Sequence, residues 1–283
     1  REDQVLFTYL HLAADRPLTE ALLAARTTAL AYETVQLPSG MLPLLYPMSE
    51  VAGCLAPQVG AHSLLRPQGG RGLLLGAIGG VKNANVVVLG GGTAGQNAAN
   101  IALGMGAAVT VLDTDLEKLR GTFWRYHNQV QGIASTALSI ADQVMQADLV
   151  IGSVLIPGAR APKLVSNELI AAMKPGSVLV DIAIDQGGCF ADSHPTTHDD
   201  PTFEVHQSLL YCVANMPGAV PHTSTFALTN ATLGYIVRVA THGWREAARR
   251  DPALAGGVTT HAGAITHPGV ADAFPDLNSA ELA

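Results

Sequence analysis

The sequence predicts an α/β protein built on a doubly wound parallel sheet. Short apolar runs alternate with helical patterns along most of the chain, which is typical of β-α-β units that form parallel sheets. One apolar run, residues 86–89, breaks into glycines that open a helical pattern. Aromatic residues make up only 5% of the chain, so the core must consist mainly of Ala, Val, Leu and Ile, which suits a sheet covered on both faces.

The glycine run has the spacing of a dinucleotide-binding turn. Gly90, Gly92 and Gly95 fit the pattern G-x-G-x-x-G. The first glycine permits a tight turn, the second lets the backbone approach a pyrophosphate, and the third lets the helix pack closely on the strand. The N-terminus of that helix offers N–H groups to the phosphates. We therefore expect a Rossmann domain here, although a glycine-rich turn in another α/β unit is the alternative.

A second predicted strand, residues 108–112, strengthens this interpretation because it ends at Asp113. That acid falls about 20 residues after the glycines, where a ribose-binding carboxylate belongs. A carboxylate pairs with the free 2′-hydroxyl of NAD and repels the 2′-phosphate of NADP. The sequence therefore predicts NAD as the cofactor.

The bulk composition excludes several functional classes. The chain has 283 residues, enough for two domains, and its 48% hydrophobic and 14% charged residues favour a large core over disorder. The net charge is −7 without a long run of Lys or Arg, so we expect neither a nucleic-acid partner nor a membrane partner. The cysteines are odd in number and scattered, which indicates reduced thiols in a cytoplasmic protein.

We expect three segments along the chain. Residues 1–45 form a substrate or catalytic domain, residues 46–221 form the Rossmann domain, and residues 222–283 form a long helix and a tail that return to the first domain. The long helix is predicted over 225–249, and the tail after Asp251 is uninformative because Ala, Gly and Pro dominate it.

The first segment predicts a parallel crossover. Strands at 6–10 and 29–32 flank a helix at 17–25, with Asp15 as its N-terminal cap. Two parallel strands cannot stand alone as a domain. We therefore expect the remaining strands before Arg1, so that the chain holds a partial, N-terminally truncated flavodoxin-like domain into which the Rossmann domain is inserted.

The middle segment begins with a predicted helix from about Ser49, which Pro57 should kink or interrupt. The further elements expected are strands at 148–151, 177–182 and 210–214 and a helix at 166–173.

Ligands of doubly wound sheets bind beyond the carboxyl ends of the strands, and two residues there are candidates for catalysis. Asp185 follows the apolar strand end, where a carboxylate can orient water or stabilise a cationic iminium. The alternative for Asp185 is a turn aspartate that binds its own backbone. His11 ends the first predicted strand and can move a proton, or it can be a hydrogen-bonded core histidine.

Metal sites have little support in the sequence. Cys189, His194 and His198 are loosely spaced for zinc. Glu33 and His242 can share a cation only if the long helix folds back onto the first domain. The sequence also lacks a G-x-S-x-G elbow, so hydrolase chemistry has no support.

Several long stretches together resemble alanine dehydrogenase, a family that shares its fold with the NAD-binding subunit of proton-translocating transhydrogenase. The stretches are residues 7–14, 47–53, 161–165, 180–188 and 213–217, with the glycine run. The resemblance covers nearly the whole chain. It implies reversible oxidative deamination of L-alanine to pyruvate and ammonium, with NAD as hydride acceptor, in a homo-oligomer that is commonly a hexamer. The alternatives are a transhydrogenase subunit and an inactive NAD-binding fragment.

The resemblance also implies roles for individual residues. His11 and Asp185 match the catalytic residues of the family, and Glu33 and His242 match positions where some members hold magnesium. His194 departs from the family pattern, which often has an arginine there. The substrate-carboxylate arginine and lysine of the family lie upstream of its catalytic histidine, so no residue here is assigned those roles. The glycine turn and the resemblance together give the following cofactor-binding candidates: Ser49, Gly90, Gly92, Thr93, Ala94, Gly95, Asp113, Lys118, Ser135, Val154, Leu155, Ile182, Ala183, Ile184, Val213, Ala214, Asn215 and Met216.

Overall fold

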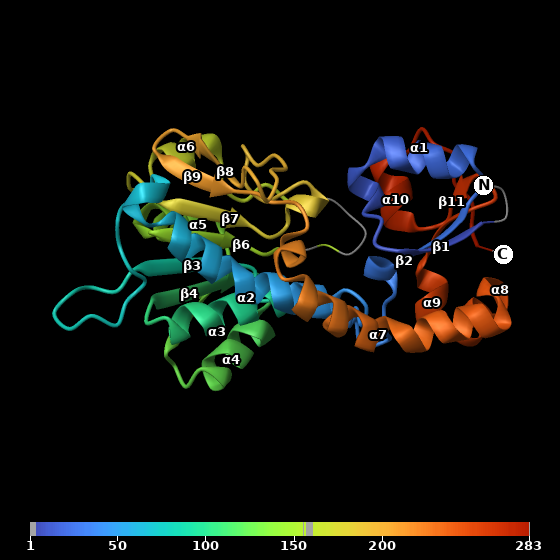
Figure 1. Ribbon diagram of the computed structural model, residues 1–283, viewed down its shortest axis with the longest axis horizontal. Coiled ribbons are helices and arrows are strands. Elements are labelled where there is room, and N and C mark those ends of the chain that lie inside the picture. Colours follow the sequence, from blue (N-terminus) through green and yellow to red (C-terminus); the bar gives the residue numbers. More distant parts are fainter. Residues whose placement is uncertain (1–3, 155, 157–160, 283) are drawn as a thin grey trace. The chain divides into compact units, whose positions relative to one another are not determined.

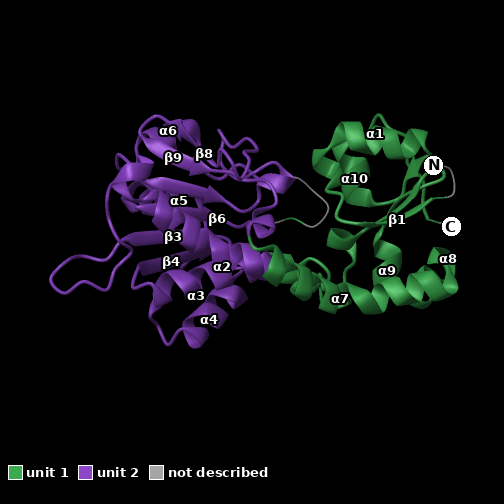
Figure 2. Cartoon of the chain, viewed as in Figure 1, with its two compact units in different colours: residues 1–48, 156–160, 220–283 green, residues 49–155, 161–219 purple. Residues whose placement is uncertain are grey.

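The computed structural model describes residues 4–154, 156 and 161–282. The chain divides into two compact units, shown in different colours in Figure 2. Unit 1 comprises residues 1–48, 156–160 and 220–283, and unit 2 comprises residues 49–155 and 161–219.

Unit 2 is built on a seven-stranded sheet in the described part of the chain, with the strand order β5-β4-β3-β6-β7-β9-β8 (Figure 1). Neighbouring strands run parallel, except that β8 pairs antiparallel with β9 at one edge. The order reverses between β3 and β6, which defines the switch point of a doubly wound sheet. The predicted fold class is therefore confirmed. The strands are β3 (Asn85–Leu89), β4 (Ala108–Asp113), β5 (Val130–Ala134), β6 (Leu149–Gly152), β7 (Val178–Asp181), β8 (Thr202–Val205) and β9 (Ser208–Tyr211).

Helices cover both faces of this sheet (Figure 1). On one face, Ile140 and Val144 of α5 and Ile170 of α6 pack with Val87 and Leu179 of the strands. On the other face, α2 approaches β6 so closely that a Cβ at position 60 would lie 2.7 Å from the Leu149 side chain. The helices of unit 2 in the described part of the chain are α2 (Tyr46–Ser63), whose first three residues belong to unit 1, α3 (Thr93–Gly104), α4 (Leu116–Arg125), α5 (Ala137–Gln146) and α6 (Asn167–Ala171).

Helix α2 runs through Pro57 without the predicted interruption, and the alternative, a kink at Pro57, stays a prediction. Proline removes one backbone donor from a helix. Here the helix buries Val51, Leu55 and Pro57 itself along its packed side. Tertiary packing supplies most of the stability of a helix in a protein, and it outweighs the loss of one hydrogen bond.

Unit 1 contains a smaller sheet with the order β1-β2-β10-β11. Strands β1 (Val5–Thr8) and β2 (Thr28–Ala31) are parallel, as the sequence predicts, and α1 (Arg16–Ala24) connects them. The side chain of Asp15 accepts the N–H of Leu18 at 2.9 Å and caps α1.

The second neighbour of β2 comes from the tail after Asp251, where the sequence predicts no strand. Strand β10 (Val258–His261) pairs antiparallel with β2, and β11 (Ala264–Ile265) pairs with β10. The expectation that the partners of β2 precede Arg1 is therefore wrong for this side of the strand. Thr259 and Thr260 are buried and donate their hydroxyls to the carbonyls of Ala29 and Thr27. A strand with buried threonines lacks the apolar alternation by which strands are found.

Two apolar clusters cover the sheet of unit 1. Ala29 and Ala31 face a cluster with α1 and α10 (Pro268–Ala273). Leu30 faces a cluster with α7 (Pro221–His242), α8 (Trp244–Arg250) and α9 (Pro252–Gly256). The long helix predicted over 225–249 is divided, because α7 (Pro221–His242) ends before Gly243, whose φ is 74°, and α8 (Trp244–Arg250) follows. Among the described residues, no helix is both long and apolar enough to cross a membrane.

The cysteines of unit 2 differ in burial, which gives a prediction. Cys189 and Cys212 are fully buried, and burial raises the pKa of the Cys212 thiol to about 12. Cys54 is half-buried. A thiol reagent at about pH 8 should modify at most one cysteine of the native protein, Cys54, and all three after denaturation. Modification of three thiols in the folded protein would contradict the packing around Cys189 and Cys212.

Candidate functional site

The glycine turn lies between β3 and α3 at the switch point of the sheet. Gly90 has a φ of 102°, which only glycine adopts without strain. A Cβ at position 95 would lie 1.8 Å from the carbonyl oxygen of Gly90, so the helix packs on the turn only because Gly95 has no side chain. A Cβ at position 92, by contrast, would have no described atom within 4 Å.

The start of α3 therefore fits the phosphates of a dinucleotide. Gly92 is the N-cap of this helix, and no described side chain caps it. Thr93 and Ala94 form the first turn of α3, whose N–H groups lack intrahelical acceptors. A pyrophosphate can accept hydrogen bonds from such a terminus.

Asp113 lies at the end of β4 beside this turn. One carboxylate oxygen, Oδ2, accepts the N–H of Gly91 at 2.7 Å, and the other, Oδ1, accepts the N–H of Asp115 at 2.8 Å. Lys118 places its Nζ 3.6 Å from Oδ2. The two oxygens of a carboxylate have about four acceptor positions, so Asp113 can still accept a ribose hydroxyl. Ser135, which follows β5, donates its N–H to the carbonyl of Asp113 at 2.9 Å.

Gln96 binds the carbonyl of Gly91, whose N–H is bound by Asp113. The sequence did not identify Gln96 as a site residue. Its Nε2 donates to the carbonyl of Gly91 at 3.3 Å and to Oγ1 of Thr122 at 2.6 Å. The hydroxyl of Tyr126 donates to the backbone carbonyl of Gln96 at 2.6 Å. The only signal in the sequence is a polar residue on the apolar face of a helix, and such residues also occur in helices that bind no ligand.

The strand ends beyond β6, β7 and β9 carry further predicted residues. Ser153, which precedes Val154, donates its hydroxyl to the carbonyls of Leu89 and Gly90 at 2.9 Å, so it fixes the turn to β6. Leu155 lies outside the described residues. Ser49 lies half-buried in α2.

Asp185 connects two of these strand ends. It lies in a short 3₁₀ helix, Ile184–Gln186, in the segment that follows β7. Its carboxylate accepts the N–H of Asn215, with oxygen–nitrogen distances of 3.2 and 3.4 Å. The structure therefore brings Asp185 and Asn215 together, and the binding of a cofactor by residues 182–184 and 213–216 stays a prediction.

His11 follows β1 in unit 1 and has a strained backbone, with φ 48° and ψ 39°. The buried carboxylate of Glu33 accepts the N–H of His11 at 2.7 Å and the N–H of Leu10 at 3.2 Å. The ring of Tyr9 stacks on the imidazole with a centroid distance of 6.0 Å. The buried Nδ1 has no hydrogen-bond partner among the described residues, which is unusual for a buried polar atom.

The metal predictions gain no support. Both oxygens of Glu33 face the backbone N–H groups of Leu10 and His11, and His242 is exposed at the end of α7. The His194 ring contacts the Phe203 ring, with a centroid distance of 3.8 Å and an angle of 30° between the ring planes. Within residues 4–154, 156 and 161–282, no group of three or more His, Cys, Asp or Glu side chains is placed to hold a metal ion.

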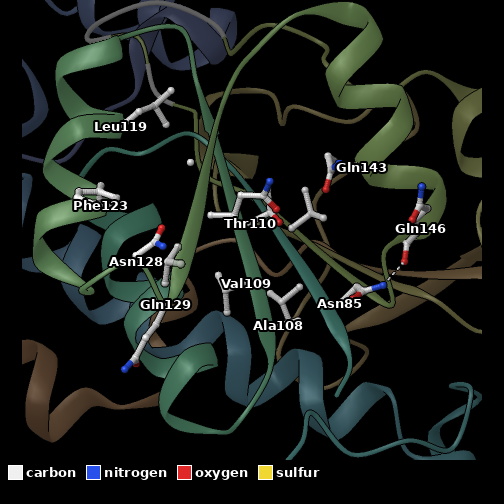
Figure 3. Close-up of a pocket in the computed structure, with 15 residues that line it drawn as sticks. Asn85, Ala108, Val109, Thr110, Leu119, Phe123, Asn128, Gln129, Gln143 and Gln146 are labelled. Atoms are coloured by element: carbon white, nitrogen blue, oxygen red, sulfur yellow. Dashed lines mark hydrogen bonds between the residues drawn. The ribbon is translucent and has the colours of Figure 1, made fainter. Parts of the chain in front are cut away.

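A cavity of about 720 Å³ lies elsewhere on unit 2 (Figure 3). It lies over β3, β4 and β5 toward their amino ends, and carboxamides such as Asn85, Gln131 and Gln143 line it. None of the described residues predicted to bind the cofactor lines this cavity. The glycine turn, at the carboxyl end of β3, is a separate place in the fold.

A glycine turn at the switch point of a doubly wound sheet, with an acid at the end of the next strand, defines a dinucleotide-binding protein. Two family models match the chain: "Alanine dehydrogenase/PNT, N-terminal domain" over residues 1–52 and "Alanine dehydrogenase/PNT, C-terminal domain" over residues 56–268. The chain belongs to the alanine dehydrogenase/PNT family.

Individual relatives agree with this assignment. An alanine dehydrogenase of Mycobacterium tuberculosis (strain CDC 1551 / Oshkosh) is 62% identical over 96% of this chain and 73% of the relative. A solved L-alanine dehydrogenase superposes with a TM-score of 0.86 and 51% identity, over 98% of this chain and 76% of the other. A transhydrogenase from Sinorhizobium meliloti superposes with a TM-score of 0.74 over 93% of this chain and 75% of the other. Its identity of 22% shows a shared fold alone.

The close approach at Gly95 predicts a strong effect of one methyl group. Gly95→Ala should weaken NADH binding by at least about tenfold and destabilise the protein by about 1–3 kcal/mol, because the Cβ overlaps the Gly90 carbonyl. NADH fluorescence titration and urea unfolding measure the two effects. Gly121→Ala is the matched control, because position 121 lies in α4 with open space around a Cβ. It should leave NADH affinity unchanged. Equal NADH affinity in the Gly95→Ala variant would contradict the assignment of the turn.

Proposed function

We propose that the protein catalyses the reversible NAD-dependent oxidative deamination of L-alanine to pyruvate and ammonium. The observation that carries this proposal is the identity of 62% with an alanine dehydrogenase over nearly the whole chain. The glycine turn and Asp113 support NAD as the cofactor. The chemistry that bound NAD supplies is acceptance of the hydride that leaves the α-carbon of the substrate.

The proposal assigns a role to each unit and to the assembly. Unit 2 binds the cofactor and unit 1 contributes to substrate binding and catalysis. The family resemblance favours a homo-oligomer, commonly a hexamer, and the free cysteines Cys54, Cys189 and Cys212 favour a cytoplasmic location.

Asp113 and the α3 N-terminus bind the cofactor in this proposal. The turn at 90–95 donates N–H groups to the pyrophosphate, and the carboxylate of Asp113 accepts a ribose hydroxyl. The candidates at the strand ends, Ser135, Val154, residues 182–184 and residues 213–216, are proposed to line the rest of the dinucleotide. Ser49 and Lys118 are proposed contacts of its phosphate and adenosine regions.

Asp185 and His11 carry the chemistry of the substrate. Oxidation of the amine leaves a cationic iminium, which the Asp185 carboxylate stabilises while it orients the attacking water. The imidazole of His11 moves protons to and from the substrate as ammonia leaves. The constraint of the His11 backbone by Glu33 supports this role, because a catalytic ring must be held in one orientation.

The reaction itself is tested by adding pyruvate and ammonium to the protein with NADH. We expect NADH oxidation that depends on both substrates, and at least about tenfold lower efficiency with NADPH, because Asp113 repels a 2′-phosphate. Hydride transfer between dinucleotides, without any dependence on pyruvate and ammonium, would instead indicate a transhydrogenase activity. NADH binding without turnover would indicate an inactive NAD-binding protein.

The role of Asp185 is tested by Asp185→Asn. This change should lower kcat for pyruvate amination by about 10²–10⁴-fold, because the amide neither stabilises the cation nor activates water. The dissociation constant of NADH should stay nearly unchanged. Asp192→Asn is the control, because Asp192 follows in the same segment and accepts the side-chain amide of Asn167 at 3.0 Å. A loss of NADH binding in Asp185→Asn would show that Asp185 is structural.

A further inference from the structure

The turn that carries Asp185 is held from inside by a buried carboxylate. Asp181, the last residue of β7, has no exposed surface. Its Oδ1 accepts the N–H of Ala183 at 3.0 Å, and its Oδ2 accepts the N–H of Cys189 at 2.9 Å and that of Phe190 at 3.4 Å. Oδ2 also accepts the hydroxyl of Ser193 at 2.5 Å.

A cation also binds the same turn. Lys163 donates its Nζ to the carbonyl of Gly187 at 2.7 Å and to the carbonyl of Phe190 at 2.8 Å. Asp181 therefore binds N–H groups of the turn, and Lys163 binds its carbonyls. These contacts fall on residues before and after Asp185, so they fix the backbone around it. The Asp185 carboxylate itself accepts the N–H of Asn215 and has further acceptor positions for a ligand.

Burying a carboxylate is costly, and burial raises the pKa of Asp181 although the hydrogen bonds from Ser193 and Cys189 oppose that shift. Apolar side chains often stabilise a core better than buried charged groups do. A carboxylate in this position instead provides directed hydrogen bonds that fix one backbone conformation. Misplacement of a reacting group by about 1 Å can cost about 10²-fold in rate.

We propose that Asp181 and Lys163 are positioning residues for Asp185. Together they hold the turn at 183–190, and through its backbone they direct the Asp185 carboxylate toward the substrate. This inference rests on the proposed role of Asp185 in the deamination of L-alanine.

A matched pair of residues at the opposite end of the sheet provides the control. Asp148 precedes β6, is buried, accepts the N–H of Asn85 at 2.9 Å, and pairs with Lys174 at 3.1 Å. It resembles Asp181 in burial and in its backbone contact, but it lies at the amino ends of the strands, far along the sheet from Asp185.

The experiment compares Asp181→Asn and Lys163→Met with Asp148→Asn and Lys174→Met. The first two variants should lower kcat for pyruvate amination about 10–100-fold, with NADH affinity and the KM for pyruvate changed by less than about threefold. The control variants should change kcat by less than about twofold, whatever they do to stability. Equal losses of kcat in the two pairs would overturn the proposal. Lys163 is exposed, so Lys163→Met keeps the test valid if Asp181→Asn does not fold.

A double variant distinguishes positioning from a general structural effect. In the Asp185→Asn background, Asp181→Asn should lower kcat by less than about twofold further, because the group that it directs is already absent. An undiminished further loss would show that Asp181 does not act through Asp185 and would overturn the proposal.

Hydrogen exchange provides a measurement that does not depend on activity. The amides of Ala183, Cys189 and Phe190 should exchange faster in Asp181→Asn than in the wild type, and at the wild-type rate in Asp148→Asn. Unchanged exchange at these amides would show that Asp181 does not hold the turn at 183–190, and would overturn the proposal. A wild type that fails to aminate pyruvate would refute the proposed function, and with it the positioning of Asp185 for catalysis. Faster amide exchange in Asp181→Asn would still show that Asp181 holds the turn.

Discussion

Buried carboxylates at the carboxyl ends of strands accept backbone N–H groups from the turns that carry the candidate site. Asp113 holds Gly91 at the glycine turn, Asp181 holds Ala183 and Cys189 beside Asp185, and Glu33 holds His11. A hydrogen bond to a charged group contributes about 1.5–3 kcal/mol, and an unpaired buried carboxylate is strongly unfavourable. Each turn therefore has one favoured backbone conformation, which fixes the positions from which the functional side chains extend. The strained backbone of His11 persists because Glu33 compensates for it.

Sequence patterns predict those parts of the fold in which the local sequence and the tertiary packing favour the same structure. The glycine spacing, the apolar strand before it and Asp113 after it identify the dinucleotide turn, because each residue has a local steric or electrostatic reason. The parallel crossover of β1 and β2 and the Asp15 cap follow in the same way. The resemblance of several long stretches to alanine dehydrogenase predicts the function as well. The family models confirm that the chain belongs to this family.

Other features depend on contacts between residues far apart in the chain. Strand β10 cannot be predicted from the local sequence, because the hydroxyls of Thr259 and Thr260 find their hydrogen-bond acceptors only when β2 lies beside them. Pro57 is tolerated because α2 is held by its neighbours, which the local sequence does not reveal. Lys163 binds the carbonyl of Gly187, 24 residues away, and Gln96 binds the hydroxyl of Thr122, 26 residues away. Asp181 acts over a shorter distance in the chain, on the N–H groups of the turn that follows its strand. No spacing rule marks such residues, and only the folded structure shows what they hold.

The central claim is that the N-terminus of α3, held by Asp113, receives the dinucleotide. Amide hydrogen exchange with and without NADH tests this most directly. The account predicts that NADH slows exchange of the amides at residues 92–95, while exchange around the cavity of Figure 3, at residues 128–131, stays the same. Protection at residues 128–131 with no change at 92–95 would contradict the account.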